Sequence, residues 1–338
     1  MKKSENARHL RTRIQSIGLS RDAIAAAWPA WWSSDAEAST SSRTELRFSL
    51  ARKLGLDPRS LLEEADEPRF LWRDEARFKH LSGQGALERA AITSFGVALG
   101  TLLITAAPAT AHDLRVRAAA VRDSMLGKAV PFVRLLDLLS FCWTVGIPVA
   151  HLRVFPWPQK KMAAMTVRVG ERSAILLGKD SMYPAPLAFY LAHEIAHIAL
   201  GHLAEKQVLV DLEAPFAEFM QGDGEEDSAD MYALEVLTGE PRPVVVPIAG
   251  PSSSRELGRV ARVASKPLRI EPGTLALCFG YNTRDWATAY GAMPHIYTSA
   301  KPVWHEVNKV AKMHLALDRL PDDSADYLNA VLGSRQSS

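Results

Sequence analysis

The stretch LAHEIAHIALGH, residues 191–202, places three histidines and one glutamate among leucine, alanine, isoleucine and glycine. Such an apolar run predicts a buried helix, which Gly201 ends. Residues four apart lie one turn apart on the same helix face, so His193 and His197 point the same way. An imidazole in an apolar interior needs a polar partner. The stretch therefore predicts that the two histidines bind a shared partner.

His193, Glu194 and His197 form the pattern H-E-x-x-H. Two imidazoles at this spacing can reach one zinc ion at about 2.0–2.1 Å. The glutamate beside them is then the general base that takes a proton from the attacking water. The pattern alone also fits two surface histidines on an amphipathic helix, but the apolar residues around it favour the metal site.

A catalytic zinc site needs a third protein ligand and an open position. The pattern H-E-x-x-H-x-x-G-x-x-H would supply a histidine at 203, but Leu200 and Leu203 stand where it requires glycine and histidine. Glu226 is the alternative. It lies four residues before Asp230 on a predicted helix from about 225 to 237, so that Glu226 can bind the metal while Asp230 accepts a hydrogen bond from the outer nitrogen of a ligand histidine.

The remaining acidic residues of this segment, Glu225 and Asp227, are expected to be a solvated face at a helix N-terminus. A further donor for the oxyanion is expected but not identified by the pattern. The candidates are His202, Tyr190 and Tyr232, each of which also has a structural interpretation. For His202 that interpretation is a cation at the C-terminal end of a helix.

The pair HEIAHIALGH and EEDSADMYALEVL resembles the ImmA/IrrE family of metallopeptidases, over about residues 130–240. The resemblance implies a zinc endopeptidase with a small thermolysin-like core that cuts a repressor-like protein and so regulates stress-response or mobile-element genes. The chain departs from the family after the second helix, where it reads VLTGEP. The family also implies an N-terminal helix-turn-helix domain, and LARKLGLDPRSLLEE is similar to the end of one, but WPAWWSSDAEASTSSR fits poorly. DNA binding is therefore only weakly supported.

The expected fold is α+β and mostly helical. Thr166 to Val169 alternate in polarity, Gly170-Glu171 makes a turn and Ser173 to Leu177 is again extended, which predicts a hairpin before the histidine helix. Strand 173–177 is expected to offer its edge to the substrate backbone. We expect four regions: a helical domain at 1–65, a helical connector at 66–125, a zinc metallopeptidase domain at 126–240 and a helical region at 255–338.

The composition is that of an ordinary globular protein: 338 residues, 47% hydrophobic, with a net charge of +2. Two cysteines far apart in the sequence make no disulfide framework, and no apolar segment follows the basic N-terminus, so a cytoplasmic protein is expected. Residues 90–111 carry no charge, and a membrane anchor is an alternative that their glycines, threonines and proline oppose. We expect a buried helix there. The main rival function is a non-catalytic regulator with a structural zinc site, which would not need Glu194.

Overall fold

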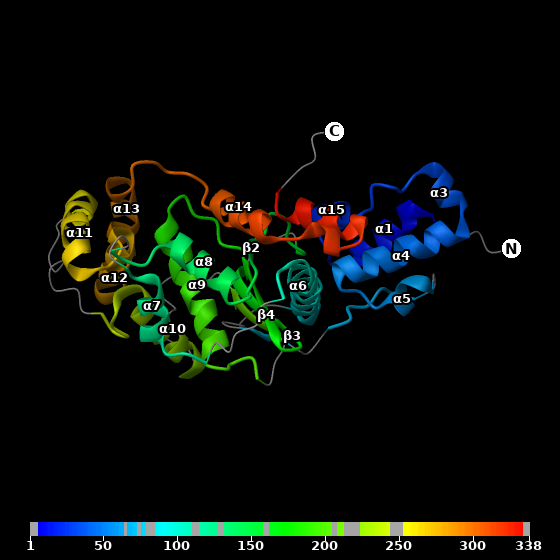
Figure 1. Cartoon of the computed structure of the whole chain (residues 1–338). Helices are drawn as coiled ribbons and strands as arrows, with labels where there is room; N and C mark the ends of the chain where they lie inside the picture. Colours follow the sequence, from blue (N-terminus) through cyan, green and yellow to red (C-terminus); the bar gives the residue numbers. More distant parts are fainter. Residues whose placement is uncertain are drawn as a thin grey trace.

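A computed structural model describes residues 6–63, 66–72, 76–78, 85–109, 115–127, 131–157, 162–204, 208–212, 224–243 and 253–333. The protein is α+β and mostly helical, as expected (Figure 1). Within these residues, five strands form one mixed sheet in the order β1-β5-β3-β4-β2. The strands are β1 (Ala76–Phe78), β2 (Val149–His151), β3 (Met162–Val169), β4 (Arg172–Leu177) and β5 (Val208–Leu212).

The predicted hairpin is confirmed. Strands β3 and β4 pair antiparallel, with Val169 opposite Arg172. Gly170 at the turn has a φ of +60°, a left-handed conformation that glycine adopts without a Cβ penalty. Strand β4 also pairs with β2 on its other side, so the expected role of strand 173–177 as an exposed edge for substrate is wrong. The sheet continues past the hairpin on both sides, and β4 lies inside it.

Helix α9 (Pro184–Ala199) covers one face of the sheet and α6 (Ala86–Ala106) covers the other (Figure 1). Helix α6 is the long apolar segment of the sequence, and among the described helices it alone has the length and apolarity to span a membrane. In the structure 83% of its most apolar window is buried, against β3, β4 and α4. Gly96 and Gly100 allow this close approach, since an added Cβ would lie 2.1 Å from the Met165 sulfur and 3.0 Å from Val167, respectively.

Region 66–125, which we expected to be a helical connector, also contains a strand. It contributes strand β1 to the sheet and helix α6 to the core, followed by α7 (Ala118–Met125). The division at residue 65 also has no counterpart in the packing, because Leu10, Leu50 and Leu61 share one hydrophobic core with α6 and the sheet. The N-terminal helices pack at one end of this core. They are α1 (Ala7–Ser16), α2 (Arg21–Ala27), α3 (Ser34–Ala38), α4 (Thr40–Leu54) and α5 (Pro58–Leu62).

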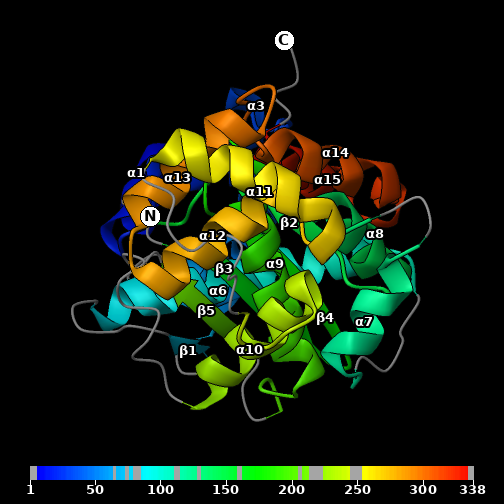
Figure 2. The same cartoon turned by 90° about the vertical axis from the view of Figure 1, so that its left-hand side faces the viewer.

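The C-terminal region is helical, as predicted, but it divides between the two ends of the molecule (Figure 1). Helices α11 (Ser254–Leu268), α12 (Pro272–Thr283) and α13 (Trp286–Ile296) form a cluster with its own core that also packs on α9 (Figure 2). The chain then returns along α8 (Leu135–Thr144) and β2 through α14 (Trp304–His314). A short 3-10 helix, η3 (Leu317–Arg319), and α15 (Asp322–Val331) pack on α6, and α15 also contacts α2 and α4.

Candidate metal centre

Helix α9 begins at Pro184, whose missing N–H costs nothing in the first turn of a helix. Its middle is buried between the sheet, α8 and α10 (Gly224–Thr238). It ends as predicted: Ala199 is the last helical residue, Leu200 is the C-cap, and Gly201 follows with a φ of +77°. His193 and His197 are 1% and 3% exposed, so both imidazoles lie in the interior.

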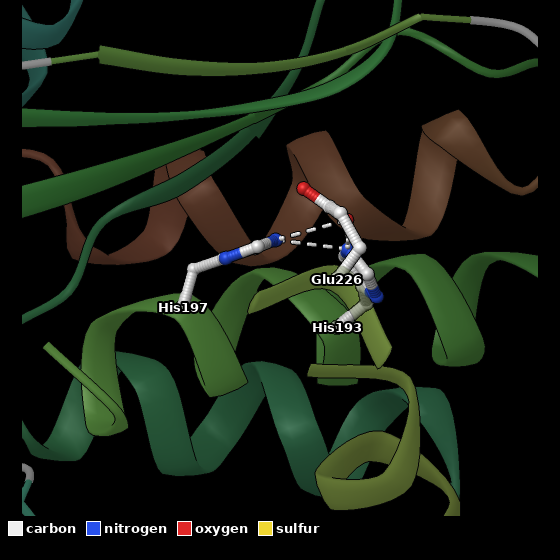
Figure 3. Close-up of side chains that lie close together, drawn as sticks. All are labelled: His193, His197 and Glu226. Atoms are coloured by element: carbon white, nitrogen blue, oxygen red, sulfur yellow. Dashed lines mark hydrogen bonds and ion pairs between the residues drawn. The ribbon is translucent and has the colours of Figure 1, made fainter. Parts of the chain in front are cut away.

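Three side chains converge where α9 meets α10. Nε2 of His193 lies 2.9 Å from Nε2 of His197. The Glu226 carboxylate oxygen Oε2 lies 3.2 Å from the first of these nitrogens and 3.7 Å from the second. Figure 3 shows the His197 ring pointing toward the His193 ring and the Glu226 carboxylate. The structure thus brings together the three residues that the sequence predicts as ligands.

The donor set fits a metal ion. Two imidazole nitrogens and one carboxylate oxygen lie within 4.8 Å of one another. Such atoms are the ligands of catalytic zinc sites with two histidines and a glutamate. Burial lowers the pKa of His197 to about 4, with the Glu226 hydrogen bond acting in the opposite direction. The ring is therefore neutral near pH 7, the state in which a histidine can donate a lone pair to a metal.

Asp230 lies behind His193. Its Oδ1 is 2.8 Å from His193 Nδ1, on the side of the ring away from the cluster. A carboxylate accepts hydrogen bonds and does not donate them, so His193 carries its proton on Nδ1 and its lone pair on Nε2. The structure places Asp230 where the sequence predicts it, and one helix, α10, supplies both Glu226 and Asp230.

Glu194 points toward the sheet. It is 1% exposed, and its carboxylate accepts a hydrogen bond from the hydroxyl of Thr166 in β3. Thr166 was not among the residues that the sequence singled out. The sequence shows only a polar residue in a predicted strand; the structure shows that this strand is buried on both faces, so that the Thr166 hydroxyl needs a partner.

The three further candidates have different surroundings. His202 lies next to the cluster, with its Nδ1 2.8 Å from Nδ1 of His197. Tyr232 points away, because its hydroxyl donates to the carbonyl of Val116 at 2.8 Å and so fixes α10 to the segment before α7. Tyr190 belongs to α9 itself, is 3% exposed and packs in the core. The hydrogen bond of His202 thus reaches a predicted ligand, whereas that of Tyr232 is structural.

Comparison of the chain with family models, curated proteins and solved structures found no match. The functional argument therefore depends on the residues of the site and on their geometry.

Proposed function

We propose that the protein is a zinc-dependent endopeptidase, with His193, His197 and Glu226 as the metal ligands and Glu194 as the general base. The observation that carries the proposal is the convergence of three ligand atoms with a buried glutamate next to the first ligand. A structural zinc site has four protein ligands and needs no base, whereas a catalytic site has three and keeps one position open. Zinc, when bound, would act as a Lewis acid toward a peptide carbonyl and would lower the pKa of a water molecule.

Glu194 would take a proton from the water as the water oxygen bonds to the peptide carbonyl carbon, and would then deliver that proton to the peptide nitrogen, so that the C–N bond breaks after the C–O bond has formed. The Thr166 hydroxyl occupies one lone pair of the Glu194 carboxylate and holds its orientation during both transfers. Asp230 keeps the His193 proton on Nδ1, which leaves Nε2 available to the metal. The roles of Thr166 and Asp230 each rest on a hydrogen bond that the structure contains.

The substrate class is part of the same proposal. The resemblance of residues 130–240 to the ImmA/IrrE family favours a thermolysin-like core that cuts one repressor-like partner and so regulates transcription. A partner of this kind would be cut in an exposed loop or linker, where an extended chain can enter the site. In this proposal the enzyme acts in the cytoplasm, in keeping with Cys142 and Cys278 as free, buried thiols. DNA binding by the N-terminal helices is not part of the proposal.

The test combines metal analysis with cleavage assays. The purified protein should contain close to one zinc per chain, and chelation should abolish hydrolysis. The zinc-loaded protein should be incubated with casein, with an unrelated unfolded protein and with a repressor encoded beside it. We expect cleavage of the repressor alone. Zinc without any hydrolysis would favour the non-catalytic regulator, and efficient cleavage of casein with the repressor intact would overturn the narrow specificity.

A further inference from the structure

His202 contacts His197 through both its backbone and its side chain. The end of α9 is a Schellman motif: the N–H of Gly201 donates to the Ile198 carbonyl at 3.2 Å, and the N–H of His202 donates to the His197 carbonyl at 3.0 Å. This motif brings the second residue after the helix back beside the third residue from its end. The side chains usually make an apolar contact there. Here they are two imidazoles, with their Nδ1 atoms 2.8 Å apart.

The direction of the hydrogen bond between the two imidazoles follows from Ser228. The Ser228 hydroxyl donates to the carbonyl of Glu225 at 2.8 Å, so its proton is already used. Its oxygen lies 3.4 Å from Nε2 of His202 and can only accept there. A neutral His202 that donates from Nε2 to this oxygen has its lone pair on Nδ1. Its Nδ1 accepts the Nδ1 proton of His197, and the Nε2 lone pair of His197 is left facing His193 and Glu226.

We propose that His202, oriented by Ser228, is a positioning residue that holds His197 in the tautomer and ring orientation required for metal binding. The inference rests on the metal site proposed above and deepens it. Each histidine ligand then has an outer partner. Asp230 holds His193 directly from α10, and Ser228 of the same helix holds His197 through His202. Residues 226, 228 and 230 of α10 thus each serve the site, the first as ligand and the other two as support.

The test measures zinc affinity of the full chain by competition with a chromophoric chelator. His202→Leu keeps most of the side-chain volume but removes both nitrogens, and we expect its affinity to fall by about 10–100-fold, the scale for an outer partner of a ligand. His202→Asn places an acceptor oxygen where Nδ1 stands, and it should recover most of the loss. The visible spectrum of the cobalt-loaded protein should change in the leucine variant and return toward wild type in the asparagine variant.

Ser228→Ala provides a test that leaves both histidines intact. We expect a severalfold loss of zinc affinity, smaller than that of His202→Leu because the Ser228 contact is long. Ser124 is a matched control, since its hydroxyl also donates to the carbonyl three residues earlier, Val121, at 2.7 Å. Ser124→Ala removes the same kind of local bond from α7 and should leave zinc affinity unchanged.

The outcomes separate this inference from the proposed function. If the wild-type protein binds no zinc, the proposed function is wrong and His202 has no metal ligand to support. If the wild-type protein binds zinc and His202→Leu binds it equally well, the metal site stands and the role of His202 is overturned. An asparagine variant as weak as the leucine variant would show that an acceptor at the Nδ1 position does not support His197, and would overturn the inference. If the leucine variant does not fold, the comparison of Ser228→Ala with Ser124→Ala decides, and equal affinities would overturn the inference.

Discussion

Helices α6 and α9 lie on opposite faces of the same sheet, and both are apolar and largely buried (Figure 1). They differ in the polar groups that they bury. Helix α6 buries the hydroxyls of Thr93 and Ser94 among alanine, leucine and glycine, with Glu88 in its first turn. Helix α9 buries His193, Glu194 and His197 within five residues.

The difference shows what distinguishes a site from a core. Burying an ionisable group is costly unless it has hydrogen bonds or a charged partner. On α9 the groups at positions 193, 194 and 197 each contact a polar side chain from elsewhere: Asp230, Thr166 and His202. On α6, the Thr93 hydroxyl has no hydrogen-bond partner within the described part of the chain. Convergent polar side chains, and not apolarity or burial, distinguish the α9 face, where the proposed site lies, from the α6 face.

The largest expected effect comes from exchanging a buried glutamate on each face. Glu194→Gln should keep its zinc and lose hydrolysis by at least about 100-fold, since general-base catalysis contributes roughly 10²–10⁴-fold. Glu88→Gln alters a glutamate on α6 that is only 6% exposed, and it should leave turnover unchanged. Zinc content and cleavage rate are measured on both proteins. Near wild-type cleavage by the Glu194 variant would refute the general-base assignment.

The next effect separates two neighbouring glutamates of α10. Glu226→Ala should reduce zinc affinity by more than the roughly 10–100-fold typical of an outer partner, because a ligand itself is lost. Glu225→Ala should change it little, since that residue is expected to serve only the solvated start of the helix. Competition with a chelator measures both. Equal affinities of the two variants would place the third ligand elsewhere.

Asp230→Ala should give an intermediate effect, weakening zinc binding by about 10–100-fold. The carboxylate oxygen 2.8 Å from His193 Nδ1 fixes the proton that keeps Nε2 free for the metal. The control is Asp227→Ala in the same helix. An unchanged affinity in the Asp230 variant would mean that His193 needs no outer partner.

Much of the site could be predicted from the sequence because helical spacing sets direction. The four-residue steps from His193 to His197 and from Glu226 to Asp230 each place two side chains on one face, and an apolar surface brings the two helices together. The hairpin could be predicted in the same way, from the alternation of polar and apolar residues and from Gly170 at the turn. These features are local, so a short window of sequence contains all the information that they need.

The missing parts depend on contacts between distant segments. Thr166 is far from Glu194 in the sequence, and only the packing of α9 on β3 joins them. The extent of the sheet was missed for the same reason, since β1 is short and pairs with β5 far along the chain. His202 is an exception: Gly201 predicts a Schellman motif, and the motif itself places His202 beside His197. The position of His202 can therefore be predicted from the sequence by the capping motif, whereas the helix-dipole interpretation does not place it beside His197.

The smallest expected effect comes from replacing one buried threonine by valine on each face of the sheet. Because the substitution is the same, it compares the two faces most directly. Thr93 of α6 and Thr166 of β3 are both 0% exposed, and valine replaces a threonine with almost no change in shape. At Thr166 valine removes the donor to a buried carboxylate, which should destabilise the fold by about 1–3 kcal/mol and slow hydrolysis. At Thr93 no hydrogen bond among the described residues is lost and a buried polar group disappears, so stability should stay within about 1 kcal/mol of wild type or rise.

Chemical denaturation and cleavage rates measure both variants. Equal losses of stability would show that the two faces treat a buried hydroxyl alike, and that the Thr166–Glu194 contact contributes nothing specific.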